Sequence, residues 1–276
     1  MDSLKFVTAG QPICNGSAGY DKAFDILQNL NLDGMELEFV HGVRMSPANR
    51  ELVKKISNEK NMVLTAHGPY YINLNSKEDD KIAASITRVL DTARIGKELG
   101  AYSVTYHAAF YMGMNPEDVY KKVEKSMAEI CKTLDEEGND IWVRPETTGK
   151  ATQWGNLEEI VKLSKDFKQV LPCVDFSHLH ARTNGLYNTY DEFCKIFETI
   201  GNEIGSYALE NFHAHIAGIE YGPKGEKKHL MLKESDMNYT DLLKAFKKFD
   251  VKGVVVCESP IMEQDAVLLK DYYLSL

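Results

Sequence analysis

The sequence has no long apolar run and no disulfide framework. None of its apolar stretches approaches the roughly 18 residues that a membrane-spanning helix needs, and Met1 to Gln11 lack the basic and apolar regions of a secretory signal. Its five cysteines are odd in number and without CxxC spacing, which argues against disulfide pairing and against a zinc ribbon. We therefore expect a cytoplasmic protein with no membrane partner.

The sequence also has no surplus of basic residues. Its 32 Lys and Arg stand against 41 Asp and Glu, a net charge of −9, which argues against binding nucleic acid by bulk electrostatic attraction. Any contact with DNA phosphates must therefore be local. Bound divalent cations would each cancel two negative charges where carboxylates cluster, so an acidic chain and a phosphate substrate are compatible.

No Pro-, Gly- or Ser-rich linker and no repeat divides the chain, which favours a single domain over residues 1–276. Apolar runs bounded by turn residues alternate eight times with amphipathic segments such as 83–99 and 116–134, the order of a (β/α)8 TIM barrel of the α/β class. Gly218 to Asn238 has no periodic pattern and is expected to be a functional loop. The eight predicted strands lie near 4–8, 34–40, 61–67, 102–107, 140–146, 171–176, 208–217 and 253–258.

Metal-competent side chains end nearly every predicted strand from the third onward: His67, His107, Glu146, Asp175, His215 and Glu258. The carboxyl ends of the strands of a closed parallel barrel converge on one face. Three imidazoles and three carboxylates buried together are costly unless cations are bound. Mixed imidazole and carboxylate donors favour Zn²⁺, with Mn²⁺ or Fe as alternatives, and Glu146 is the candidate bridging ligand between two ions.

Three further histidines lie near these strand ends. In the segment DFSH, the three-residue step from Asp175 lets His178 reach the same pocket, with a capping or surface role as the alternative. His213 shares a strand face with His215 but lies one layer deeper, so we interpret it as a core histidine rather than a ligand. His180 has no comparable argument.

Together these segments resemble the endonuclease IV family, zinc-dependent nucleases that cut DNA at abasic sites. The motifs follow the order of that family over roughly residues 60 to 260: HGPYYINL from His67, TYHAAF around His107, RPETTGK around Glu146, DFSH from Asp175 to His178, HIAG from His215, and CESP around Glu258. The resemblance implies three zinc ions. The first would be bound by His67, His107 and Glu146, the second by Glu146, Asp175, His215 and Glu258, and the third by His178 with an Asp-x-His pair.

The third site departs from the family pattern. The segment Gly225-Glu226-Lys227-Lys228-His229 offers His229 but has no matching Asp, so Glu226 substitutes or only two ions bind. The alternative is a solvated loop whose lysines contact phosphate. The first strand also departs, because Phe6-Val7-Thr8 lacks the histidine expected near its end.

The resemblance implies a DNA-repair hydrolase that cleaves the phosphodiester 5′ to abasic sites in double-stranded DNA, and we expect a monomer. Glu146 and Glu258 are the candidates for proton transfer. Tyr70 and Tyr71 are the residues expected to enter the DNA at the lesion, with packing at the barrel mouth as the alternative. Weaker candidates for phosphate contacts, from predicted loops on the same face, are Arg44, Lys150 and Arg182.

Two other functions fit the same residues. Xylose isomerase-like sugar isomerases and epimerases use one divalent ion held by Glu, Asp, His and Glu, a set that Glu146, Asp175, His215 and Glu258 supply alone. The additional His67 and His107 favour the nuclease. A noncatalytic binding module is the third possibility, motivated by the altered segment 225–229, although six intact strand-end donors argue against it.

Overall fold

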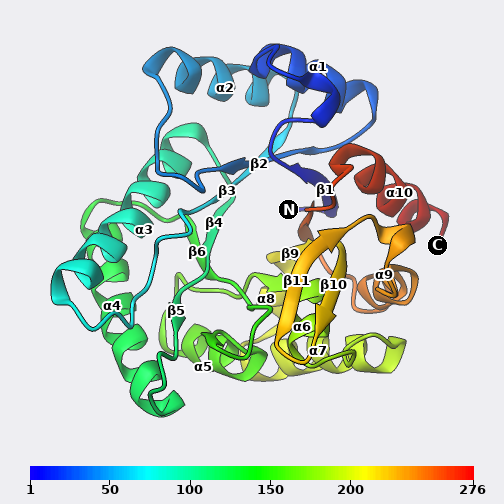
Figure 1. The fold of residues 1–276 in the computed structure, drawn as a ribbon. Coiled ribbons are helices and arrows are strands. Elements are labelled where there is room, and N and C mark those ends of the chain that lie inside the picture. The colour runs from blue at the N-terminus through cyan, green and yellow to red at the C-terminus, as the bar shows by residue number, and fades with distance from the viewer.

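The computed structural model describes all 276 residues and contains eight parallel strands rolled into a barrel (Figure 1). The hydrogen-bonded order is β6-β4-β3-β2-β1-β12-β9-β8. Parallel bridges from Val143 to Val170 and from Glu146 to Cys173 join the two edges of this sheet. The expected TIM barrel is therefore confirmed. Its strands are β1 (Leu4–Ala9), β2 (Gly34–Glu38), β3 (Val63–His67), β4 (Ser103–Tyr106), β6 (Trp142–Pro145), β8 (Val174–Asp175), β9 (Phe212–Ile216) and β12 (Gly253–Cys257).

Helices cover the outside of the barrel (Figure 1). The long ones are α1 (Tyr20–Asn29), α2 (Pro47–Glu59), α3 (Asp79–Leu99), α4 (Pro116–Glu136), α5 (Leu157–Asp166), α7 (Tyr190–Glu203), α9 (Tyr239–Lys248) and α10 (Met262–Ser275). Shorter ones are η1 (Ile13–Asn15), α6 (Phe176–Arg182), α8 (Ser206–Glu210) and η2 (Leu232–Glu234). The helical patterns at 83–99 and 116–134 are confirmed by α3 and α4. No helix has both the length and the apolar character needed to cross a bilayer.

The apolar core lies between the sheet and the helices, whereas the inside of the barrel is largely polar. Phe176, Phe197, Phe212 and Phe246 pack ring to ring between strands and helices, with centroid distances of 5.0 to 6.4 Å. The barrel interior instead holds fully buried polar side chains, among them Glu36, Thr65, Ser103, Arg144 and His213. Buried polar groups are costly without partners, so this interior is built to support a polar site.

Arg144 occupies the amino end of the barrel interior. Its guanidinium lies over the rings of Tyr102 and Trp142, at 5.4 and 5.8 Å from their centroids, and donates to the carbonyl oxygens of Pro172 and Asn211. A planar guanidinium can satisfy several carbonyls while stacking on aromatic faces. Arg144 therefore fills the amino end of the barrel interior, on the side away from the carboxyl ends of the strands.

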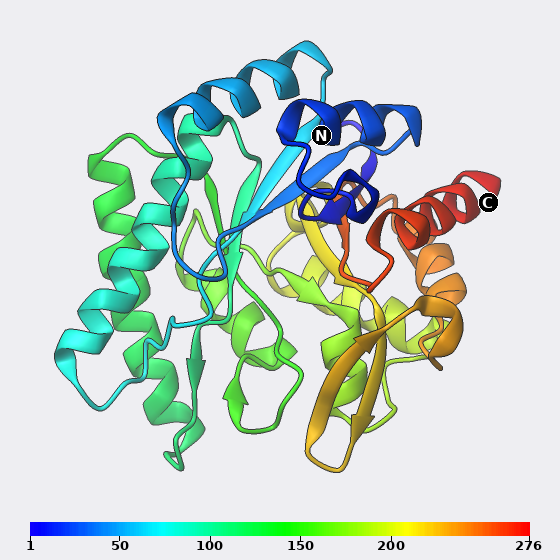
Figure 2. The same ribbon diagram turned by 45° about the horizontal axis from the view of Figure 1, so that its top comes forward.

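The segment 218–238 is not the unpatterned loop we expected. It forms an antiparallel hairpin of β10 (Gly218–Gly222) and β11 (Gly225–Leu230), followed by η2, and Figure 2 shows this hairpin extending from the barrel. Lysines and glutamates on its exposed face hid the strand pattern from the sequence. The strand predicted at 208–217 also began too early, because α8 occupies 206–210. A second small pair, β5 (Ala109–Phe110) and β7 (Gln153–Trp154), lies in loops that follow β4 and β6.

Candidate metal centre

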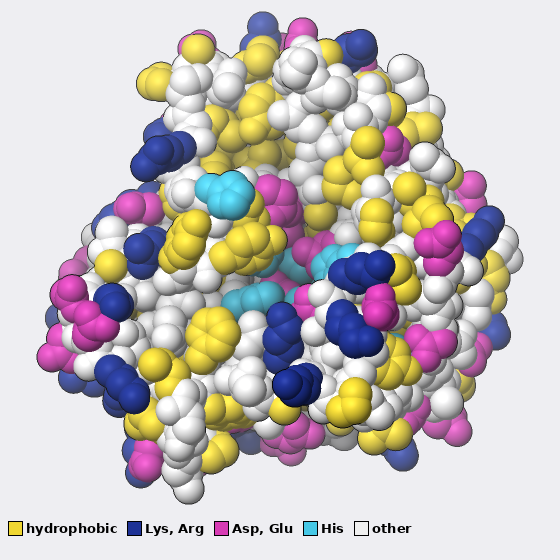
Figure 3. Space-filling view, viewed as in Figure 1, with side chains coloured by type: hydrophobic (Ala, Val, Ile, Leu, Met, Phe, Trp, Pro, Cys, Tyr) yellow, Lys and Arg dark blue, Asp and Glu magenta, His cyan; other side chains and the backbone are white.

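The six strand-end residues surround one hollow at the carboxyl ends of the strands. Figure 3, which looks onto this face, shows histidine and acidic side chains in the hollow with lysines and hydrophobic side chains around it. His67, Glu146, Asp175 and His215 are buried, whereas His107 and Glu258 are partly exposed. Parallel pairing brings residues distant in sequence to this face: Asp175 lies in register with His215 on the neighbouring strand.

Glu146 lies at the centre of the group. Its Oε2 is 3.1 Å from Nε2 of His67, and its Oε1 is 3.0 Å from Nε2 of His107. The donor atoms of these three residues lie within 4.8 Å of one another. Oε1 of Glu146 also lies 3.1 Å from Nδ1 of His178, and Oε2 lies 3.6 Å from Nδ1 of His215, so this carboxylate adjoins more than one donor group. Its role as a bridging ligand stays a prediction.

A second group of donors lies on the other side of Glu146. Nδ1 of His215 is 3.6 Å from Oε2 of Glu146 and 3.4 Å from Oε1 of Glu258. The donor atoms of Glu146, Asp175 and His215 also lie within 4.8 Å of one another. The backbone contributes here, because Asp175 caps α6 and accepts a 2.7 Å hydrogen bond from the N–H of His178 through Oδ1. Its second oxygen, Oδ2, is left facing the group.

A third group forms where the hairpin meets α6. The donor atoms of Asp175, His178 and His229 lie within 4.8 Å of one another, and Nε2 of His178 is 3.6 Å from Oε2 of Glu226. The structure thus brings Glu226 and His229 to the site, although whether they bind metal stays a prediction.

The hairpin reaches the site through a close approach of two glycines. The N–H of Glu226 donates to the carbonyl oxygen of Gly149 at 3.0 Å. A Cβ on Gly225, whose φ is +89°, would lie 2.2 Å from that same oxygen, and a Cβ on Gly149 would lie 2.7 Å from Glu226. Only glycine fits at both positions, so these two residues set the distance between Glu226 and His178.

Three of the histidines are oriented by backbone carbonyls. Nδ1 of His67 lies 2.8 Å from the oxygen of Gly68, Nδ1 of His178 lies 3.0 Å from that of Thr147, and Nδ1 of His229 lies 3.1 Å from that of Glu258. A carbonyl oxygen can only accept, so Nδ1 carries a proton and Nε2 is the nitrogen that a metal could bind in place of its own proton. Metal-binding histidines are commonly held in this way.

The donor set fits a divalent metal. Four buried polar atoms of the candidate ligands have no hydrogen-bond partner: Oδ2 of Asp175, Nε2 of His229 and both ring nitrogens of His215. Buried polar atoms without partners are rare and costly. Coordination to a cation would satisfy three of these atoms, and the fourth, Nε2 of His215, faces Glu36 at 3.1 Å. Mixed nitrogen and oxygen donors suit Zn²⁺, Mn²⁺ or Fe²⁺.

Charge is balanced inside the site by paired shifts in pKa. Burial alone would raise the pKa of Glu146, but the imidazoles of His107 and His215 outweigh it and hold that pKa well below its usual range. Burial would lower the pKa of His67, yet its contact with Glu146 raises it to about 10. Burial dominates at Asp175 and raises its pKa to about 6. Protons thus occupy positions that bound cations would take.

The hollow has a volume of about 280 Å³ and an apolar and basic rim. Tyr70 and Phe110 line it from the segments that follow the neighbouring strands β3 and β4, and the Tyr70 ring meets that of His67 edge-on at 6.0 Å between centroids. Lys150 also lines it and forms no ion pair. Tyr70 and Tyr71 are 59% and 62% exposed, and Tyr71 lines a different hollow. That either residue enters DNA stays a prediction.

A family model described as "Xylose isomerase-like TIM barrel" matches residues 24–272. The chain belongs to this family. A protein of Methanocaldococcus jannaschii described as uncharacterized is 42% identical over 98% of this chain and 97% of its own length. The probable endonuclease 4 of Aquifex aeolicus is 22% identical over 63% of this chain and 62% of its own length, which fits the resemblance to endonuclease IV.

Solved structures of two kinds share the fold of this xylose isomerase-like barrel. A D-tagatose 3-epimerase-like protein has a TM-score of 0.75 at 19% identity, covering 98% of this chain and 97% of its own. Endonuclease IV from Thermus thermophilus has a TM-score of 0.73 at 16% identity and 99% coverage of both chains. At these identities the likeness concerns the fold alone, so the choice between the two activities depends on the site.

Four further residues that the sequence raised as possible site residues of this xylose isomerase-like barrel do not belong to the donor groups described above. Arg182 is in α6 rather than in a loop, and its Nη1 donates to the carbonyl oxygens of Lys150 and Gln153. Its contact with phosphate stays a prediction. Arg44 lies in an exposed loop. His213 is fully buried, as expected of a core histidine, and burial lowers its pKa to about 4. His180 contacts Asp236 at 3.2 Å and helps to hold the hairpin.

Sequence reasoning missed the carboxylates of β2. Glu36 is fully buried beside His213 and His215, and Glu38 ends the strand in register with His67. The signal was present, because Met35-Glu36-Leu37-Glu38 places two charged residues on one face of a strand that is otherwise apolar.

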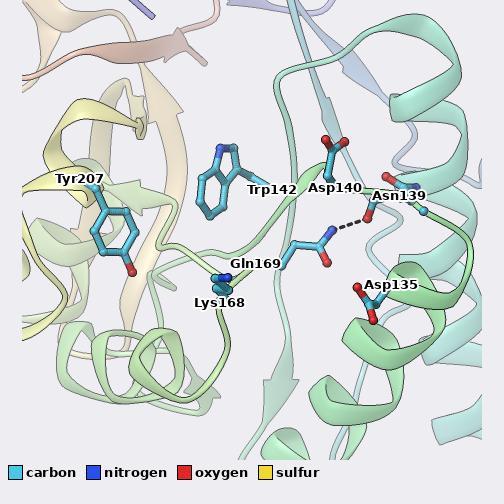
Figure 4. A pocket seen from close by; sticks show the side chains of 8 residues that line it. Asp135, Asn139, Asp140, Trp142, Lys168, Gln169 and Tyr207 are labelled. Carbon is cyan, nitrogen blue, oxygen red and sulfur yellow. Dashed lines mark hydrogen bonds between the residues drawn. The ribbon is translucent and has the colours of Figure 1, made fainter.

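A larger hollow of about 690 Å³ lies at the opposite, amino end of the barrel. Trp142, Lys168 and Tyr207 line it, with an amide of Gln169 that donates to the carbonyl of Asn139 at 2.7 Å (Figure 4). It contains no histidine and none of the candidate ligands. Active sites of TIM barrels lie at the carboxyl ends of the strands, so the smaller hollow is the candidate site.

Proposed function

We propose that this chain is a metal-dependent endodeoxyribonuclease that cleaves the phosphodiester 5′ to abasic sites in double-stranded DNA. The observation that carries the proposal is the number of donor groups that converge on one hollow. His67 and His107 meet Glu146 on one side, Asp175 and His215 meet it on the other, and a third group adjoins them through His178. Sites with two or more ions are typical of phosphodiester hydrolysis.

Each ligand assignment belongs to this proposal. The first ion would be held by His67, His107 and Glu146, and the second by Glu146, Asp175, His215 and Glu258. The third would be held by His178, Glu226 and His229. Zinc is the proposed metal, because imidazole and carboxylate donors at such sites favour it. When bound, such ions polarise the phosphodiester and lower the pKa of water.

The protein's own groups would handle the proton and the substrate. Glu258 is the better placed of the two candidate proton acceptors, since its side chain is 15% exposed whereas that of Glu146 is 1% exposed. Lys150, unpaired at the rim, is positioned to contact a phosphate oxygen. Such a local contact is what an acidic protein needs in place of a broad basic surface.

Selection of the abasic site would take place at the aromatic rim. Tyr70 and Tyr71 are the proposed residues that enter the duplex. Both are exposed, and Tyr70 lines the hollow directly. A sugar without a base leaves the helix at low cost because no stacking is lost.

A sugar isomerase or epimerase that uses one ion is the second candidate. Glu146, Asp175, His215 and Glu258 form a complete ligand set for such an enzyme, and an epimerase-like protein shares the fold. His67 and His107 would have no assigned role in that reaction, which is why we favour the nuclease.

The deciding experiment combines metal analysis with incision of a labelled duplex that carries one abasic analogue. The nuclease predicts two or three ions per chain and chelator-sensitive incision 5′ to the analogue, with an undamaged duplex of the same sequence left intact. A single ion, no incision, and exchange of the proton next to the carbonyl of a ketose would establish the epimerase instead. Bound metal without either activity would favour a binding module.

A further inference from the structure

A buried carboxylate, Glu36, lies behind the candidate ligand His215, on the side away from the hollow. Its Oε1 is 3.1 Å from Nε2 of His215, while Nδ1 of the same ring faces Glu258 and Glu146. Both side chains are fully buried. Nε2 of the His215 ring therefore faces Glu36, and Nδ1 of the same ring faces the candidate metal ligands.

Glu36 is itself held from two other directions. The hydroxyl of Thr65 donates to its Oε2 at 2.7 Å, and Nε2 of His213 lies 3.2 Å from the same oxygen. His213 is held in turn by Ser103, whose hydroxyl lies 2.9 Å from Nδ1. The contacts of Glu36 with the two imidazoles are close charge contacts rather than linear hydrogen bonds, because neither Nε2 reaches hydrogen-bonding angles. Attraction between the carboxylate and the N–H groups persists at such distances.

We propose that Glu36 is a positioning residue that holds the proton of His215 on Nε2 and thereby presents the Nδ1 lone pair to the metal centre. The inference rests on the metal centre of the proposed function. His67, His178 and His229 are oriented by backbone carbonyls, but His215, inside the barrel, has no carbonyl contact, and Glu36 takes that place. Losing such a partner typically weakens metal binding by about 10- to 100-fold.

The test measures metal affinity by chelator competition, metal content at saturation, and the visible spectrum of the cobalt-loaded protein. Glu36→Gln is expected to bind zinc about 10- to 100-fold more weakly, with the same number of ions at saturation and a shifted cobalt spectrum. The matched control is Glu263→Gln. Glu263 is also a buried carboxylate, but it accepts from the backbone N–H groups of Ile13 and Cys14, so metal affinity should not change.

Wild-type affinity and spectrum in Glu36→Gln would overturn the proposal, and loss of a whole ion at saturating metal would make Glu36 a ligand instead. If that variant does not fold, Thr65→Val decides the question, because it removes only the hydroxyl that holds Oε2. A several-fold loss of affinity supports the positioning role, and no change overturns it. A wild-type protein that binds metal but does not cut abasic DNA would refute the proposed nuclease and leave this inference intact, whereas one that binds no metal would refute both.

Discussion

Replacing His107 by alanine should separate metal binding from folding. The His107 side chain is 22% exposed at the edge of the hollow, so water can fill the space and no dry cavity forms. Its loss removes one contact with Glu146, at 3.0 Å, which costs about 1 kcal/mol of unfolding free energy. The catalytic cost is larger, because an ion that stabilises the transition state by about 4 kcal/mol contributes about 10³ in rate.

We therefore expect His107→Ala to fold, to lose one ion per chain, and to incise abasic DNA about 10³-fold more slowly than wild type. Metal content, thermal unfolding and single-turnover incision on one preparation test this. His41→Ala is the matched control, because His41 is exposed and belongs to none of the donor groups. Full metal content together with a wild-type rate in His107→Ala would refute its assignment as a ligand.

Three further results are expected. Gly225→Ala should lower metal content, because its Cβ would lie 2.2 Å from a backbone oxygen at a φ of +89°. The control is Gly222→Ala, whose Cβ would meet only a flexible lysine side chain and should leave metal content unchanged. Equal metal content in both variants would contradict the proposed role of the hairpin. The pKa of His67, raised from 6.5 to about 10, means that metal-free protein binds this proton more tightly when folded, so its stability should fall as pH rises from 6.5 to 10. The melting temperature should fall over this pH range when a chelator is present and should not fall for the zinc-loaded protein. The same pH dependence in both samples would contradict the prediction. Tyr70 is 59% exposed, so Tyr70→Ala should change the free energy of unfolding by no more than about 0.5 kcal/mol and leave metal content unchanged. In a titration it should weaken binding of abasic duplex by about tenfold. Unchanged binding would exclude a role for Tyr70 at the lesion.

The barrel could be predicted from sequence because its signals are local and repeated. Short runs of β-branched residues between amphipathic helices gave all eight strands, and Asn115-Pro116 marked the start of α4 correctly, since the Asn115 side chain caps the Glu117 N–H. The convergence of His67, Glu146 and His215 on one face then followed from barrel geometry alone.

The errors arose where tertiary contacts override local pattern. The hairpin β10–β11 has a polar exposed face, and its position depends on the fit between Gly149 and Gly225, which no spacing in the sequence reveals. Arg182 was placed in a loop, although its guanidinium is satisfied by carbonyls of a distant segment. Glu36 was overlooked because a charge in mid-strand usually signals an exposed face, and here that face lines the barrel interior.

The donors come from nearly the whole length of the chain, from His67 in β3 to Glu258 after β12. During synthesis, a ribosome must therefore complete almost the entire barrel before the second group has its last carboxylate. The metal centre proposed above can therefore be complete only late in synthesis, and until an ion binds, the raised pKa values of His67 and Asp175 favour protons on those groups. Which ion it acquires would then depend on the metal pool that the finished protein meets, and on exchange from a rigid site rather than capture by an unfolded chain.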